Sequence, residues 1–134
     1  MANEATKIEL YGHNSAGEVM PFTISSSTAI PKGSVMVLSA TPRTITIHDS
    51  IGQKFVGVTN VVKDALDTST QLGVYTNGIF NFAASGSIAD GDIVALAGIP
   101  NYVEASNAVT DYTQIVGMAF GDAAAGRVDV RVLK

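Results

Sequence analysis

Three consecutive residues, His48, Asp49 and Ser50, are of the types that form a hydrolytic triad. In a working triad these side chains come from separate segments and converge, so that the base can take the proton of the nucleophile. Along a strand, successive side chains point to opposite faces, and neighbours cannot converge in this way. We therefore interpret the run as the end of a strand entering a turn and predict no catalytic residue in it.

The carboxylates do not point to a metal site. Asp90 and Asp92 flank Gly91, as in a calcium loop, but the ladder of oxygen ligands and its terminal Glu are missing. Asp64 and Asp67 lie near each other in a loop, where carboxylates are usually solvated. With no Cys and only two His, zinc also lacks its usual ligands. We expect no metal, no cofactor and no enzymatic activity.

The charge balance argues against nucleic acid as a partner. Eight Lys and Arg stand against 12 Asp and Glu, a net charge of −4, whereas phosphate binding needs a positive surplus. Arg127, Arg131 and Lys134 form a small basic cluster that Asp129 interrupts. No apolar run reaches the ~20 residues that span a bilayer, and the polar start at residues 1–7 leads into no signal-like apolar segment. We expect neither nucleic acid nor membrane as a partner.

Charged residues are also sparse. They make up 15% of the 134 residues, against about 25% in an average soluble domain. One interpretation is the neutral surface of an ordinary β-protein. The other is that further subunits cover much of the surface, because the centres of interfaces are depleted in charge.

Short apolar runs predict an all-β domain. Residues 45–47 and 127–132 alternate between apolar and polar, which is the period of a half-buried strand. Turn residues recur about every 8–12 positions, as in sandwiches and barrels. Five apolar runs bounded by turn-forming residues fit strands buried on both faces: Val35–Leu38, Phe55–Val58, Ile79–Phe82, Ile93–Leu96 and Ile115–Met118.

The two halves of the chain are alike. Residues 30–38 (IPKGSVMVL) resemble residues 88–96 (IADGDIVAL), 58 positions later, and residues 55–58 (FVGV) resemble 115–118 (IVGM), 60 positions later. The near-constant offset predicts a duplicated β-unit, at residues 28–76 and 86–133. Two units are too few for a solenoid, and they fit one barrel or sandwich with a pseudo-twofold axis.

Gly57 and Gly117 occupy matching points of the two units. A glycine inside a strand usually marks a bulge, a bend at a barrel corner or a close approach of another segment. We predict matching structural roles for the two glycines, at strand bends or at such close approaches.

Residues 1–27 precede both units and differ from them. The run Lys7, Ile8, Glu9, Leu10 and Tyr11 alternates, with Ile8 and Leu10 on one face. Such a segment suits addition to the sheet edge of a partner, and it equally suits an added edge strand of its own domain. We divide the chain into this N-terminal arm or edge strand, 1–27, and a single β-barrel domain, 28–134, and take the run as the candidate partner-binding arm.

Two blocks resemble the capsid cement, or head decoration, proteins of tailed phages. Residues 75–96 carry a Gly-Ile-Phe strand followed by Ile-x-x-Gly-Asp-x-Val, and residues 115–132 carry Val-Gly-x-Ala, an Ala-rich turn, a Gly and an alternating valine strand. Residues 30–64 fit the same pattern, so the resemblance covers roughly residues 28–133. Its motifs are structural rather than catalytic.

The resemblance implies a small β-barrel or β-tulip-like sandwich with a structural function. Such a protein, made in the host cytoplasm, binds the outer surface of an assembled capsid in the virion and stabilises it. Its partner is the lattice of major capsid protein, commonly contacted by a homotrimer. The arm at residues 7–11 is then a candidate capsid-binding segment.

A different class of function stays open alongside this one. A carbohydrate-binding or adhesin-like β-domain of a virion or cell surface would need exposed aromatic side chains, for which Tyr102 and Tyr112 are the candidates. Phe80 and Phe82 fall on one face of their predicted strand, with Tyr75 nearby, and there we expect core packing or a subunit seam.

Overall fold

The computed structural model describes residues 4–9, 19–24, 28–59, 61–64, 66, 69–106 and 112–133. In these ranges the regular structure consists of strands and one 3₁₀ turn, η2 (Tyr112–Gln114). No helix among them is long and apolar enough to cross a membrane. The predicted all-β fold is therefore confirmed. The strands, in chain order, are β1 (Thr6–Glu9), β2 (Val19–Thr23), β3 (Val35–Leu38), β4 (Ile45–Ile47), β5 (Phe55–Thr59), β6 (Gln71–Tyr75), β7 (Asn77–Ala84), β8 (Ile93–Leu96), β9 (Tyr102–Ala105), β10 (Ile115–Ala119) and β11 (Arg127–Leu133).

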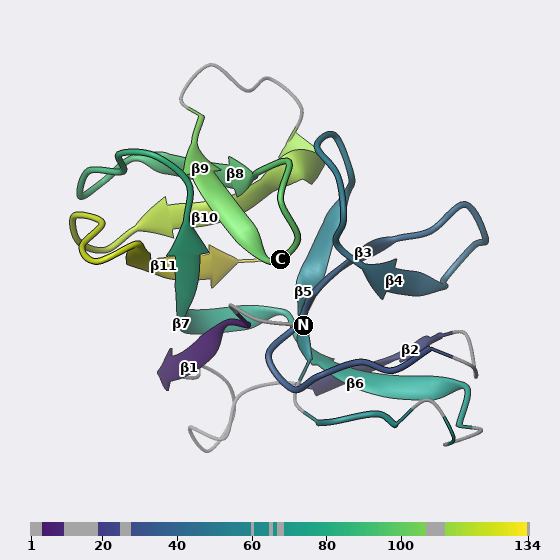
Figure 1. Cartoon of the computed structure of the whole chain (residues 1–134). Helices are drawn as coiled ribbons and strands as arrows, with labels where there is room; N and C mark the ends of the chain where they lie inside the picture. The colour runs from purple at the N-terminus through teal and green to yellow at the C-terminus, as the bar shows by residue number, and fades with distance from the viewer. Residues whose placement is uncertain are drawn as a thin grey trace.

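The strands form two sheets that lie side by side (Figure 1). The first unit has the order β2-β6-β5-β3-β4, and a single parallel bridge, Thr23 to Thr44, joins its two outer strands. The second unit has the order β7-β11-β10-β8-β9, and a parallel pairing of β7 with β9 closes it into a barrel. Strand β1 adds to β7 outside this barrel.

The two units share one topology and one register. In the first, Met36 pairs with Gly57 and the pairing then shifts by one residue; in the second, Val94 pairs with Gly117 beside the same shift. The turns that follow β3 and β8 also correspond, since Arg43 and Asn101 both have positive φ, 59° and 67°. The repeat seen in the sequence is therefore a repeat of structure.

The two halves form separate sheets: the second closes into a barrel, and the first is a sheet whose outer strands meet at one bridge. Residues 19–23, which the sequence pattern put in the N-terminal segment, supply the first strand of the first unit as β2. Neighbouring strands of a chain tend to pair with one another, and five strands from one stretch of chain are enough to surround a core.

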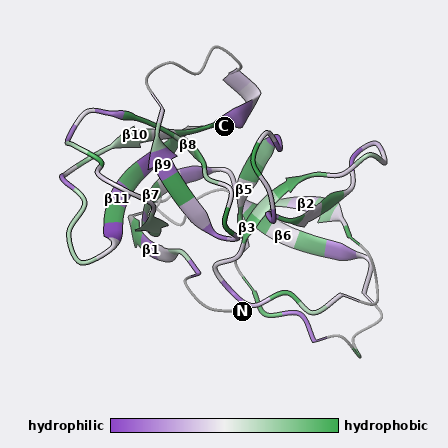
Figure 2. Cartoon of the chain, turned by 45° about the horizontal axis from the view of Figure 1, so that its top comes forward, coloured by the Kyte–Doolittle hydropathy of each residue, from purple (hydrophilic) through white to green (hydrophobic). Residues whose placement is uncertain are grey.

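Alternating side chains give the first unit two apolar faces. Met36 points into the first unit with Ile24, Ile30, Ile45, Val56, Leu72 and Val74. Val35, Val37, Phe55 and Val58 instead join the cluster that fills the second barrel. Strands β3 and β5 are thus covered on both sides, as their continuous apolar runs predict. Figure 2 shows the apolar segments along the strands of both units.

Candidate functional site

His48 does not belong to a catalytic triad. Its side chain is fully buried, its Nε2 lies 2.8 Å from the carbonyl oxygen of Ala97, and its Nδ1 accepts a hydrogen bond from the backbone N–H of Asn101. The hydroxyl of Ser50 donates to Asp49 over 3.3 Å. Both ring nitrogens of His48 are therefore engaged by backbone groups, and His48 does not act as a base toward Ser50.

The acidic residues of the turns bind backbone amides rather than a metal. A carboxylate oxygen of Asp92 accepts from the N–H of Ala89, and one of Asp122 accepts from the N–H of Asp90, each at 2.9 Å. Across the described ranges no three His, Asp or Glu residues gather as a metal site would need. Asp64 accepts from a backbone amide of its own loop, and Asp67 lies outside the described residues.

A buried polar joint connects the two units. It consists of the two contacts of His48 and a third hydrogen bond, in which the N–H of Val35 donates to Oδ1 of Asn101 over 2.9 Å. Burial lowers the pKa of His48 below its ordinary value, while the backbone at Ala97 and Ser50 and the charge of Asp49 act in the opposite direction. The imidazole is therefore neutral at pH 7, with its proton on Nε2.

The N-terminal segment spans both units. The N–H of Ala5 donates to the carbonyl of Gly33 in the first unit over 2.7 Å. The guanidinium of Arg127 in the second unit holds the carbonyl of Glu4 at 2.9 Å, and the ammonium of Lys7 lies 5.8 Å from the centre of the Tyr75 ring. Residues 4–9 thus lie across the junction of the two units.

Three of the five residues of the predicted arm lie on β1. Lys7 pairs with Phe80 of β7 and Glu9 with Ile79, so Ile8 is the extra residue of a β-bulge. The Ile8 side chain is 55% exposed. Leu10 and Tyr11 lie outside the described residues. Within the described residues β1 is the last strand on its side of the sheet, which leaves its outer backbone edge without a neighbouring strand there.

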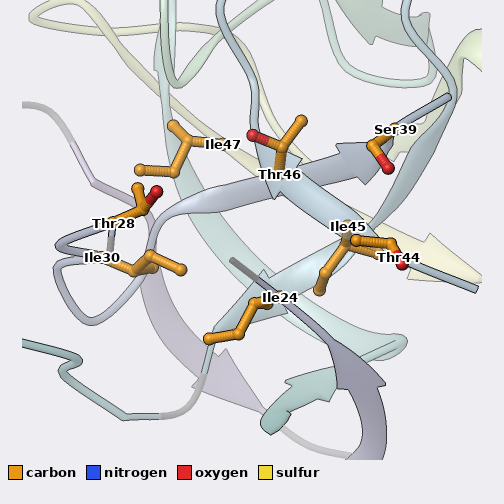
Figure 3. Close-up of a pocket in the computed structure, with 8 residues that line it drawn as sticks. All are labelled: Ile24, Thr28, Ile30, Ser39, Thr44, Ile45, Thr46 and Ile47. Atoms are coloured by element: carbon orange, nitrogen blue, oxygen red, sulfur yellow. The ribbon is translucent and has the colours of Figure 1, made fainter. Parts of the chain in front are cut away.

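An apolar pocket of about 230 Å³ opens in the first unit. Figure 3 shows Ile24, Ile30 and Ile45 lining it from three different segments. It exists because β2 and β4 meet only at the Thr23–Thr44 bridge. No charged side chain lines the pocket among the described residues, so it fits an apolar group and offers no acid or base.

The outer face of the second barrel carries exposed apolar side chains. Ile93 on β8 and Met118 on β10 are paired neighbours, 38% and 44% exposed. Phe120, 41% exposed, lies beyond the end of β10, and the guanidinium of Arg131 stacks on its ring at 6.0 Å from the centre. Such a surface suits contact with protein better than contact with a charged ligand.

A known family accounts for this combination of a two-sheet β-scaffold and an exposed apolar surface. Its sequence profile, that of the phage cement proteins, matches residues 14–133. The chain belongs to the phage cement protein family. A comparison with curated proteins gives no match. Family membership makes the chain a capsid-associated structural component of a phage virion, in a family that is not one of enzymes.

In this cement protein, Gly57 and Gly117 allow two strands to approach closely. A Cβ on Gly57 would overlap the carbonyl oxygen of Tyr75, and one on Gly117 would overlap the carbonyl of Arg131. Both glycines stand beside the register shift between their strands. Each glycine thus lies where the backbone of the adjacent strand approaches most closely.

The aromatic residues give little support for sugar binding by the cement protein. Tyr112 is 66% exposed, but Tyr102 is half-buried in β9. Phe80 and Phe82 are buried, and the Phe80 ring lies 6.0 Å from Tyr75 and 6.3 Å from Phe82. Of the two roles expected for the phenylalanines, core packing is the one observed.

The sequence pattern did not single out several residues of these surfaces. Asn101 gave no signal, because a polar residue in a Gly-Pro-rich turn normally faces solvent. Ile93 and Met118 were predicted as strand residues, but not as exposed ones. The internal repeat could have drawn attention to them, since they match Val35 and Val58 by position.

Proposed function

We propose that this chain binds the outer surface of the assembled phage capsid and stabilises it, acting as a homotrimer on the lattice of major capsid protein. The observation that carries the proposal is the match to the cement family over residues 14–133. The sparse charge of the chain and its exposed apolar side chains support a surface made to be covered by protein.

The physical basis of stabilisation is mass action. A protein that binds the mature shell, and not its dissociated subunits, stabilises that shell by RT ln(1 + [L]/Kd) per site, about 2.7 kcal/mol at a hundredfold excess over Kd. The contribution is repeated at every site of the shell. A trimer adds avidity, because its second and third contacts form at high effective concentration.

Strand β1 is the segment we propose as the capsid contact, with Lys7, Ile8 and Glu9 on it and Leu10 and Tyr11 following. Two observations support this choice. The side chain of Ile8 is exposed at a bulge, and the outer edge of β1 carries no strand among the described residues. An unpaired edge can accept a strand of a partner, with main-chain hydrogen bonds giving affinity.

The test is binding to expanded capsids that lack this protein. Wild-type protein and the variants Ile8→Asp and Ile51→Asp are mixed with capsids, and bound protein is measured after sedimentation. Ile51 is the matched control, 66% exposed in the turn after β4. We expect wild type and Ile51→Asp to saturate the capsids and to raise the temperature at which the shells break, and Ile8→Asp to bind at least tenfold more weakly.

Two results would count against the proposal. Full-length protein that never binds expanded capsids of its own virus would remove the cement function for this chain. Equal binding by Ile8→Asp and wild type would leave that function in place and remove β1 as its contact.

A further inference from the structure

The two units expose the same face to different degrees. Val35 and Val58 are paired neighbours in the first unit, and Ile93 and Met118 are the corresponding pair in the second. The valines are 0% and 1% exposed, whereas Ile93 and Met118 are 38% and 44% exposed. The same pair of repeat positions is therefore buried in the first unit and partly exposed to solvent in the second.

The cover on the first unit comes from the second. The turn after β8 supplies Ala97 and Asn101 to the joint, and Phe80 on β7 lies against Tyr75. Residues 4–5 add the contact with Gly33. The apolar face of the first unit thus packs on one side of the second unit. That side is formed by β7, the first strand of the second unit, and by the turn after β8.

The first unit has a side that corresponds to this one, formed by β2 and the turn after β3, and it is also exposed. Met20 on β2 matches Phe80 on β7, since the two pair with Val74 and Val130 at equivalent points of the sheets. Met20 is 48% exposed, and Leu38, just before the matching turn, is 45% exposed. The second unit therefore carries a partly exposed apolar face at Ile93 and Met118. The first unit carries, at Met20 and Leu38, a partly exposed copy of the side that covers such a face.

We infer that a second copy of this chain is the partner of the open face: Ile93 and Met118 of one subunit pack on Met20 and Leu38 of the next, repeating between chains the contact that joins the units within a chain. The contact is head to tail, so it leads to a closed ring where the rotation allows it. This contact names the surface through which the proposed homotrimer forms. The inference rests on the proposed function only in that respect.

The contact between chains is weaker than the joint within a chain. Ser106 occupies in the second unit the position that His48 has in the first, since the N–H of Ser106 donates to Ile93 as that of His48 donates to Val35. Arg43 occupies the position of Asn101, since both have positive φ in equivalent turns. The joint's buried hydrogen bonds are thus not repeated, and apolar contact carries the association.

The experiment uses Met118→Glu, Met20→Glu and the control Val62→Glu, which alters a side chain that is 70% exposed in the loop after β5. Masses are measured by light scattering over a range of concentration. We expect wild type and Val62→Glu to form assemblies of several 13.9 kDa chains. Each of the other two variants alone should be monomeric, with an unchanged circular dichroism spectrum. Their equimolar mixture should form dimers, because each supplies the surface that the other lacks.

Three outcomes would overturn the inference. Wild type could stay monomeric at all concentrations, both variants could assemble like wild type, or Met20→Glu could dimerise alone, which would mean that two open faces meet symmetrically. None of these results touches capsid binding, which the sedimentation of wild type with capsids decides separately. A failure of the interface and a failure of the cement function are therefore distinguishable.

Discussion

The backbone N–H of Asn101, in the second unit, donates a hydrogen bond of 3.2 Å to Nδ1 of His48, in the first. The side chain of Asn101 returns a contact by accepting from the N–H of Val35. All three residues are fully buried. The two units are thus joined by buried polar groups, each of which finds a partner in the other unit.

Acidification should weaken this joint. Burial lowers the pKa of His48 below about 6.5, so the folded protein binds fewer protons there than the unfolded chain. The free energy of unfolding is then full above about pH 6.5 and falls as the pH drops through that value. We expect a lower Tm at pH 5.5 than at pH 7.5, measured by calorimetry.

The variant His48→Gln should have a lower Tm than wild type at pH 7.5 and a smaller change between the two pH values. His13→Gln, which alters the other histidine of the chain, should keep the full change. Equal pH dependence in wild type and His48→Gln would contradict the assignment to the joint.

Asn101 and Arg43 form a matched pair for testing the buried amide. Both have positive φ at equivalent turns, so glycine relieves backbone strain at either position. Asn101→Gly also leaves the N–H of Val35 buried without its acceptor, and such a loss costs about 1–3 kcal/mol. Urea unfolding should show that decrease for Asn101→Gly and a change within about 0.5 kcal/mol for Arg43→Gly. Equal effects would mean that the amide contributes nothing beyond its turn.

The strand glycines should be intolerant of even one methyl group. Gly57→Ala and Gly117→Ala place a Cβ against the backbone of the adjacent strand, and such overpacking costs about 1–3 kcal/mol. Gly98→Ala is the control, because a Cβ there meets no atom within 4 Å. Urea midpoints should fall for the first two variants and stay near wild type for the third. A neutral Gly117→Ala would show that the strands can separate at no cost.

Arg127 should control the order of the N-terminal segment. Its guanidinium holds the carbonyls of Glu4 and Asn81 at 2.9 Å each, and its Nε donates to Oδ1 of Asn81. Arg127→Ala removes all three contacts, so amide hydrogen exchange in β1 should be faster by at least tenfold. Amides of β3 serve as the internal reference and should keep their protection. Unchanged exchange in β1 would show that pairing with β7 suffices to hold it.

Most strands were predictable because their signal is local. The alternation at residues 45–47 and 127–132 became β4 and β11, and the apolar runs became β3, β5, β7, β8 and β10. Strand β9 was missed as a strand of its own. Its sequence, YVEA, has no clear period, and it is a strand because β8 and β7 pair with it on both sides.

The amino-acid sequence by itself determined the strand pattern, the turns and the repeat, since each depends on residues close together in the chain. Only the tertiary structure decided that each repeat forms a sheet of its own, and that Val35 is buried while Ile93 is open. The reason is that burial depends on what packs on a face. Val35 is covered by Asn101, 66 residues away, and no local pattern contains that contact.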